Sequence, residues 1–220
     1  MARYSRNMLF LLVLLCATSA GAGSSYQFSE HVQRLSASDH PLWARMMTRH
    51  AEEKALLERC FAERKTCPIH LRGLRRLVGR AEGLNPHAQL VLINRFFNKR
   101  RYVRDEMDPE VGAGHWHTLN HFLRDGGDCE DYAIAKYFTL RHLGFAKETL
   151  RVVISYDTHA RDFHAMLAVE LDGRSHFLEN DNTVLRGGEQ RTYAVSYAIN
   201  EDYWWDHGMD RIGRRYSKPL

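Results

Sequence analysis

The stretch GGDCEDYAIAKY, from Gly126 to Tyr137, decides the fold because it combines a helix start with a cysteine in the first helical turn. Asp128 is a residue type that caps helices, and apolar residues follow at helical spacing, so we expect a helix from Asp128 to Leu143 that ends at Gly144. The helix macrodipole favours a thiolate at Cys129, whereas the neighbouring acids oppose one. The segment therefore predicts either a catalytic cysteine or a buried structural cysteine at a helix N-terminus.

The periodicity of the sequence changes about two thirds of the way along the chain. Apolar residues recur at helical spacing before this point, whereas the later segments are short and rich in β-branched residues. The expected helices are Pro41 to Arg64, Ile69 to Val78, Asn85 to Phe97 and the cysteine helix, and the expected strands are Leu150 to Tyr156, His164 to Leu171 and Arg174 to Asn180. The segment between Gly112 and Gly127 is expected to be loop. A helical first half and an antiparallel sheet predict an α+β domain, with the cysteine helix packed on the sheet.

Length and composition exclude several classes of protein. The chain has 220 residues, of which 44% are hydrophobic and 26% are charged, as in ordinary globular domains. These values exclude a disordered chain, a collagen-like fibre and a multi-span membrane protein. The formal net charge is +4, but no compact Lys/Arg tract with interleaved aromatic residues is present, so we expect no nucleic-acid partner.

The first residues have the features of a secretory signal peptide. Arg3 and Arg6 precede the apolar run from Leu9 to Cys16, and small residues follow as far as Gly23. We expect cleavage after Ala22, which leaves a single domain at residues 23–220. An uncleaved membrane anchor is the alternative, although the apolar run is shorter than the roughly 20 residues that a membrane span needs.

Removal of the signal would leave an odd number of cysteines, namely Cys60, Cys67 and Cys129. On one continuous helix, Cys60 and Cys67 would lie about 10.5 Å apart along the axis, which is too far for a disulfide. A bridge between them requires the helix to end first, as Pro68 suggests, and the spacing leaves both outcomes open. In either case Cys129 has no obvious partner.

A histidine and an acid that could assist Cys129 lie on the predicted hairpin. His164 begins one strand, and Asp172-Gly173 is a strong signal for a two-residue turn. The strand pairing set by this turn places Asp181 opposite His164, with Glu179 one step away on the same face. A longer turn would shift the pairing and favour Glu179. A carboxylate beside the imidazole would fix its tautomer and stabilise its charged form.

These segments together resemble a known family. The Gly-Asp-Cys-Glu-Asp block, the strand HAMLAVEL, the Asp181-Asn182 pair and the run YAVSYAINEDYWWDHG are similar to the bacterial transglutaminase-like cysteine proteinases, and more narrowly to the LapG-type periplasmic proteases. The resemblance implies a papain-like, transglutaminase-like α+β fold and a Cys-His-Asp triad formed by Cys129, His164 and Asp181. One departure is that Leu178-Glu179-Asn180 stands where the family usually has Leu-Asp-Asn.

The same resemblance implies a cofactor, a substrate and a partner. It implies that Asp128 and Glu130 bind calcium, whereas spacing alone favours Asp128 as a helix cap and Glu130 as an acid at the positive end of the helix. It implies a periplasmic enzyme that cuts the N-terminal region of a large surface adhesin next to paired alanines, which releases the adhesin and promotes biofilm dispersal. It also implies sequestration by an inner-membrane cyclic-di-GMP receptor.

Two other functions remain open at this point. A transglutaminase-like amide transferase would use the same three residue types to pass the acyl group to an amine. An exported, non-catalytic binding module would simply bury Cys129. The reactivity of the thiol in the native protein distinguishes the second alternative from an enzyme.

Overall fold

The computed structural model describes residues 26, 28, 32–105, 115–187 and 192–208 of the chain. The expected signal peptide at residues 1–22, with its cysteine Cys16, lies outside these residues. Within the described ranges, every helix is too short or too polar to cross a bilayer. The proposed single domain at residues 23–220 stays a prediction.

The helices occupy the first two thirds of the chain. They are α1 (Pro41–Ala62), α2 (Arg72–Ala81), α3 (Pro86–Phe97), α4 (Leu119–Asp125) and α5 (Cys129–His142), with 3-10 turns at Ala37–Asp39, Ile69–Leu71 and Lys147–Thr149. Four of the α-helices confirm the sequence prediction. The exception is α4, which lies where a loop was expected and which begins where the Thr118 side chain accepts a hydrogen bond from the His121 N–H. The expected helix at residues 69–78 is a 3-10 turn followed by α2.

The strands form one antiparallel sheet. They are β1 (Gln33–Ser36), β2 (Leu150–Asp157), β3 (Asp162–Leu171), β4 (Arg174–Leu178), β5 (Val184–Arg186), β6 (Tyr193–Ile199) and β7 (Tyr203–Asp206), in the order β1-β7-β6-β2-β3-β4-β5. Each neighbouring pair runs antiparallel. The predicted α+β class is therefore confirmed.

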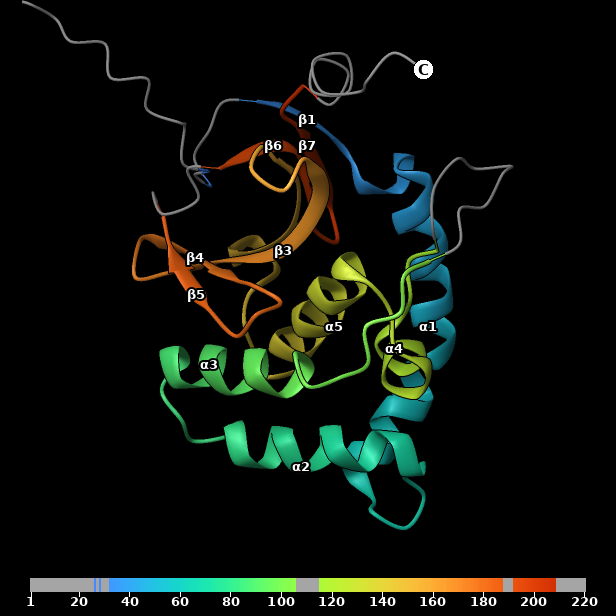
Figure 1. Cartoon of the computed structure of the whole chain (residues 1–220). Coiled ribbons are helices and arrows are strands. Elements are labelled where there is room, and N and C mark those ends of the chain that lie inside the picture. Colours follow the sequence, from blue (N-terminus) through green and yellow to red (C-terminus); the bar gives the residue numbers. More distant parts are fainter. Residues whose placement is uncertain (1–25, 27, 29–31, 106–114, 188–191, 209–220) are drawn as a thin grey trace, which may run out of the picture.

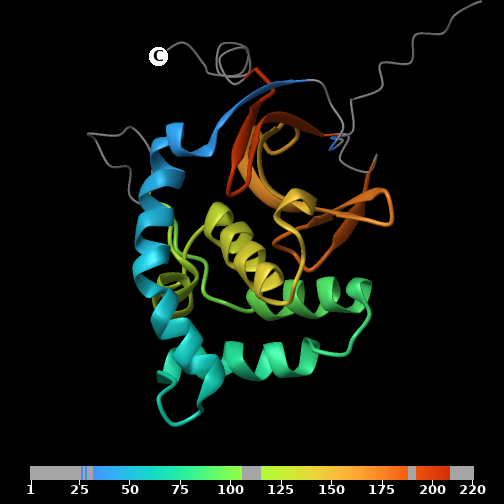
Figure 2. The same cartoon turned by 180° about the vertical axis from the view of Figure 1, so that it is seen from behind.

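Helix α5 is the centre of the molecule. It packs against β2 and β3 on one side and against α3 and α4 on the other, with α1 beyond α4 (Figures 1 and 2). Every residue from Asp131 to Leu140 is buried for this reason. The burial of nearly the whole helix fixes the position of its first residue, Cys129, relative to the sheet.

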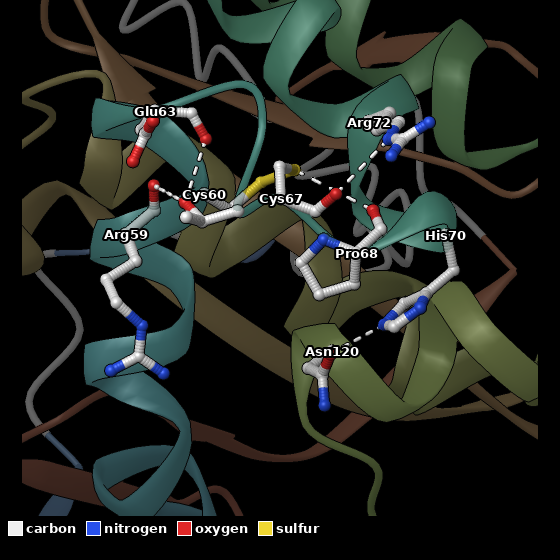
Figure 3. The surroundings of a disulfide bond; sticks show 9 residues. Arg59, Cys60, Glu63, Cys67, Pro68, His70, Arg72 and Asn120 are labelled. Atoms are coloured by element: carbon white, nitrogen blue, oxygen red, sulfur yellow. Dashed lines mark hydrogen bonds between the residues drawn. A yellow bond between two sulfur atoms is a disulfide. The ribbon is translucent and has the colours of Figure 1, made fainter.

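A disulfide joins Cys60 and Cys67, whose Cα atoms lie 4.0 Å apart. The helix α1 ends at Ala62, and the chain turns back so that Cys67 faces the last helical turn (Figure 3). The Arg72 Nε donates to the Cys67 carbonyl at 3.2 Å and ties the turn to the start of α2. The bridge that the spacing left open is therefore formed, and Cys129 is the free cysteine among the described residues.

Candidate active site

Two glycines allow the chain to enter α5 at Cys129. Gly126 has a φ of +89°, and a Cβ atom there would approach the Arg101 carbonyl oxygen to 2.5 Å. At Gly127 a Cβ atom would overlap the carboxylate of Asp131. Both positions therefore require glycine, one for its backbone conformation and both for space.

The Asp131 carboxylate anchors the loop that leads into the helix. It is fully buried, and it accepts hydrogen bonds from the backbone N–H of Asp128 at 3.3 Å and of His117 at 2.6 Å. The His117 Nδ1 lies 3.0 Å from the same carboxylate. Burial lowers the pKa of His117, but the hydrogen bond and charge of Asp131 outweigh it, so the pKa is raised. Asp131 was not singled out from the sequence, although an acid three residues after a helix cap is a known signal.

The Cys129 thiol lies in an environment that favours its neutral form. Its Sγ is 3.3 Å from the Glu130 Oε2, and the thiol donates to that carboxylate. Burial raises the pKa of Cys129, the charges of Glu130 and Asp128 raise it further, and the backbone N–H of Ala165 acts in the opposite direction. A nucleophilic thiolate at this position therefore needs a base and relief from the acidic charge.

The candidate base is His164 on β3. Its Nε2 lies 2.6 Å from the Glu179 Oε2, and because a carboxylate only accepts hydrogen bonds, Nε2 carries the proton. Nδ1 of the neutral ring is then a proton acceptor. Cys129, His164 and Glu179 line one cavity of about 460 Å³. The structure thus brings the predicted cysteine and histidine to the same cavity, with Glu179 as the acid.

The predicted acid, Asp181, also borders this cavity, but the hydrogen bond to the His164 Nε2 is made by Glu179. Its Oδ1 accepts from the backbone N–H and the hydroxyl of Thr183 at 2.9 and 2.6 Å, and these bonds lower the pKa of Asp181. The turn at Asp172-Gly173 does have two residues, and Leu171 pairs with Arg174 as expected. The placement of Asp181 opposite His164 is nevertheless wrong, because the ladder does not extend as far as these two residues.

The pairing of β3 and β4 ends before it reaches the acid. The last pair is Leu167 with Leu178, and the chain then leaves the sheet. Glu179 is consequently the diagonal neighbour of His164, at a separation that a long side chain can span. The expectation that Glu179 would be favoured by a longer turn is also wrong. The turn has two residues, and Glu179 contacts His164 because the β3–β4 pairing ends at Leu178.

The predicted metal ligands, Asp128 and Glu130, are brought together at the start of α5. Asp128 has an extended backbone (φ −106°, ψ −159°), so its side chain leaves the helical path, and ligand atoms of Asp128, Cys129 and Glu130 all lie within 4.8 Å of one another. Burial and the adjacent Asp128 carboxylate raise the pKa of Glu130 to about 9. The Asp128 Oδ1 is buried, and no hydrogen-bond partner for it exists among the described residues.

These carboxylates fit a hard divalent cation. An unpartnered buried oxygen beside a second buried carboxylate is destabilising unless a proton or a cation lies between them. Calcium prefers oxygen ligands and accepts irregular geometry. A third acid is adjacent, because the backbone N–H of Asp105 donates to the Asp128 Oδ2 at 3.3 Å. No motif in the sequence singles out Asp105, which lies far from the cysteine in the chain.

Aromatic side chains form much of the cavity wall. Tyr102 and Phe163 are 54% and 53% exposed, and both border the cavity that contains Cys129. Tyr193 stacks on the His164 ring, with centroids 5.5 Å apart. The Arg104 guanidinium forms an ion pair with Asp162 at 3.1 Å at the same rim. The cavity thus combines exposed aromatic rings with charged and polar side chains.

Comparisons with known proteins agree with this chemistry. The family model described as bacterial transglutaminase-like cysteine proteinase matches residues 52–205. The structure of Legionella pneumophila LapG is similar, with 25% identity, a TM-score of 0.55 and coverage of 67% of this chain and 88% of that one. EGTA-treated LapG of the same organism has 26% identity, a TM-score of 0.55 and coverage of 64% and 77%. Calcium-bound LapG has 27% identity, a TM-score of 0.55 and coverage of 63% and 78%. The comparison with curated proteins finds no significant match.

Proposed function

The chain belongs to the bacterial transglutaminase-like cysteine proteinases, and from this premise we propose that it is a calcium-dependent periplasmic cysteine endopeptidase. The observation that carries the proposal is the single cavity that contains Cys129 and the hydrogen-bonded pair His164 and Glu179. A nucleophile, a base and an acid that orients the base are the minimum set for acyl transfer through a thioester.

The proposed mechanism follows from the protonation states. His164 Nδ1 takes the proton of the Cys129 thiol, and the sulfur attacks the scissile carbonyl carbon. Glu179 stabilises the imidazolium that forms, since it accepts the Nε2 hydrogen bond at 2.6 Å. The imidazolium then protonates the leaving amine, and water hydrolyses the thioester. The backbone N–H of Cys129 at the helix N-terminus is a candidate donor to the oxyanion.

Asp128 and Glu130 would hold the calcium, together with oxygen atoms from neighbouring groups such as Asp105. Bound calcium supplies positive charge that offsets the two carboxylates. Such charge would favour the thiolate, because burial and these two acids together raise the pKa of Cys129. The calcium-bound structure of Legionella pneumophila LapG supports the same assignment.

The substrate, partner and location are proposed on the family resemblance. The substrate would be the N-terminal region of a large surface adhesin, cut next to paired alanines, so that cleavage releases the adhesin and promotes biofilm dispersal. An inner-membrane cyclic-di-GMP receptor would sequester the enzyme. The aromatic rim formed by Tyr102 and Phe163 is compatible with an extended peptide but does not select a sequence.

The decisive experiment incubates the purified protein with N-terminal fragments of surface adhesins, with and without calcium, and identifies new N-termini by mass spectrometry. Cys129→Ser is the control. New N-termini next to paired alanines, absent with Cys129→Ser, are expected. Including a primary amine tests the alternative reaction, since an amide transferase would attach the amine to the acyl product. No processing of any fragment, combined with a thiol inert to iodoacetamide, would instead indicate a binding module.

A further inference from the structure

Lys136 is a buried charge that the proposed mechanism does not use. Its side chain is 0% exposed and lies on α5, about two turns beyond Cys129. The Nζ donates to the Asn180 Oδ1 at 3.0 Å, to the Glu179 carbonyl at 3.1 Å and to the Leu178 carbonyl at 3.5 Å. Three acceptors match the three donors of an ammonium group, although none of them is charged.

Burial of this ammonium group is costly. Burial lowers the pKa of Lys136 to about 7, and the charges of Glu179 and Asp181 only partly offset that effect. A methionine or leucine would fill the same space among apolar neighbours without this cost. The position of the ammonium group therefore calls for an explanation other than packing.

The three acceptors lie where β4 ends and the catalytic acid begins. The ladder between β3 and β4 stops at Leu178, so the sheet does not fix the Glu179 carbonyl. Instead that carbonyl accepts from Lys136 on α5 and from the Nδ2 of Asn98, just after the end of α3, the latter at 2.7 Å. The Glu179 carbonyl is thus held by two side chains outside the sheet, whereas the Glu179 N–H still donates to the Thr183 carbonyl at 3.1 Å.

We propose that Lys136 is a positioning residue that fixes the Glu179 backbone so that its carboxylate meets His164. The same helix carries the nucleophile at its first residue and the ammonium group two turns later, and the helix is buried from Asp131 to Leu140. Lys136 thereby fixes the position of Glu179 relative to Cys129. The expected effect on peptide cleavage rests on the proposed endopeptidase function. The expected effect on the hydrogen bond between His164 and Glu179 does not.

A matched control is available one residue along the helix. The Tyr137 hydroxyl, also buried, donates to the Glu201 Oε1 at 3.1 Å, and Glu201 does not line the catalytic cavity. Tyr137→Phe removes a buried hydrogen bond of α5 without touching the acid. Lys136→Met removes the ammonium group and keeps the length of the side chain. The two variants separate loss of helix stability from loss of positioning.

The first measurement is independent of catalysis. The His164 Nε2 proton, in a short hydrogen bond to a carboxylate, is expected to give a far-downfield proton NMR signal. The signal should be present in the wild type and in Tyr137→Phe, and it should be lost in Glu179→Gln and in Lys136→Met. If Lys136→Met does not fold, Asn180→Ala replaces it, since that change removes one acceptor of the ammonium group and should shift or broaden the signal.

The second measurement is the rate of peptide cleavage at a temperature at which every variant is folded. Lys136→Met is expected to lower kcat by about 10- to 100-fold, as a small misplacement of a catalytic group does. In the Glu179→Gln background the same change should lower kcat less than about twofold, because the group that it positions is already gone.

The outcomes are distinct. A Lys136 variant that keeps the downfield signal, or that keeps its full kcat while only its melting temperature falls, overturns the proposal. Equal fold losses in the wild-type and Glu179→Gln backgrounds overturn it as well. If the wild type cleaves no peptide, the proposed function fails, and the NMR signal alone then decides whether Lys136 positions Glu179.

Discussion

Glu179→Gln is the substitution that tests the active site most directly. The Glu179 Oε2 lies 2.6 Å from the His164 Nε2, and the Glu179 side chain is only 7% exposed. The glutamine keeps the shape of the side chain and loses its charge. Its amide can also turn an N–H toward His164, which would hold the imidazole in the wrong tautomer for accepting the thiol proton at Nδ1.

The size of the effect follows from the hydrogen bond that is lost. A hydrogen bond to a charged group contributes about 1.5–3 kcal/mol, and each 1.36 kcal/mol of barrier corresponds to about tenfold in rate. We therefore expect Glu179→Gln to lower kcat/KM by about 10- to 150-fold. Asp181→Asn removes a charge but keeps an oxygen that can accept from Thr183, and in the described part of the chain Asp181 has no hydrogen bond to His164, so its kcat/KM is expected to stay within about twofold of the wild type.

The assay follows cleavage of one peptide substrate at concentrations well below KM, with new N-termini quantified by mass spectrometry. Circular dichroism and urea unfolding on each variant exclude a loss of fold. The reasoning is refuted if Asp181→Asn loses as much activity as Glu179→Gln, or if Glu179→Gln retains wild-type kcat/KM. Either result would mean that the hydrogen bond from His164 to Glu179 is not the one that supports the reaction.

Further predictions concern the remaining machinery and the fold. Cys129→Ala should abolish cleavage, measured with the same peptide, and leave the urea midpoint near that of the wild type, because the side-chain hydrogen bond that it removes is that of a weak thiol donor to Glu130. His164→Ala should be nearly as damaging, whereas His159→Ala, on an exposed turn, should retain most of the kcat/KM. Chelation should suppress cleavage, and calcium should restore it better than magnesium, which demands stricter octahedral geometry. Replacing Cys60 and Cys67 together by serine should lower the free energy of unfolding by about 2 kcal/mol in urea titrations, since the closed loop is short.

Local sequence signals predicted the elements that surround the cysteine. The apolar runs at β2 and β3 and the turn at Asp172-Gly173 are each specified by a few adjacent residues. Helix α4 was missed because seven residues are too few to display a helical period. The strands β1 and β7 pair although they lie at opposite ends of the described chain, and their contact depends on tertiary packing that no local pattern encodes.

The metal-binding residues show a similar limit. Spacing alone could not decide whether Asp128 and Glu130 diverge or converge, since that depends on the backbone at the cap. The extended conformation of Asp128 brings the two carboxylates together, and the raised pKa of Glu130 is the electrostatic result of burial and that proximity. The extended backbone is fixed by the glycine pair and by Asp131, a contact set that becomes visible only when the loop and helix are folded together.

The hydrogen-bond partner of His164 shows how two correct observations led to a wrong placement of Asp181. Glu179 and Asp181 lie two positions apart, so the alternation of side chains places both on the face of His164 and cannot separate them. The register of the hairpin favoured Asp181, and that register is present, but only as far as Leu178. Beyond that point the Glu179 carbonyl accepts hydrogen bonds from Lys136 and Asn98 and not from β3. A glutamate is long enough to reach His164 along the diagonal, which accounts for Leu178-Glu179-Asn180 at the place where the family usually has Leu-Asp-Asn. The hydrogen-bond partner of His164 is thus decided by where the pairing of β3 and β4 ends, and beyond that point Lys136 on α5 and Asn98 after α3 bind the Glu179 carbonyl in place of the ladder.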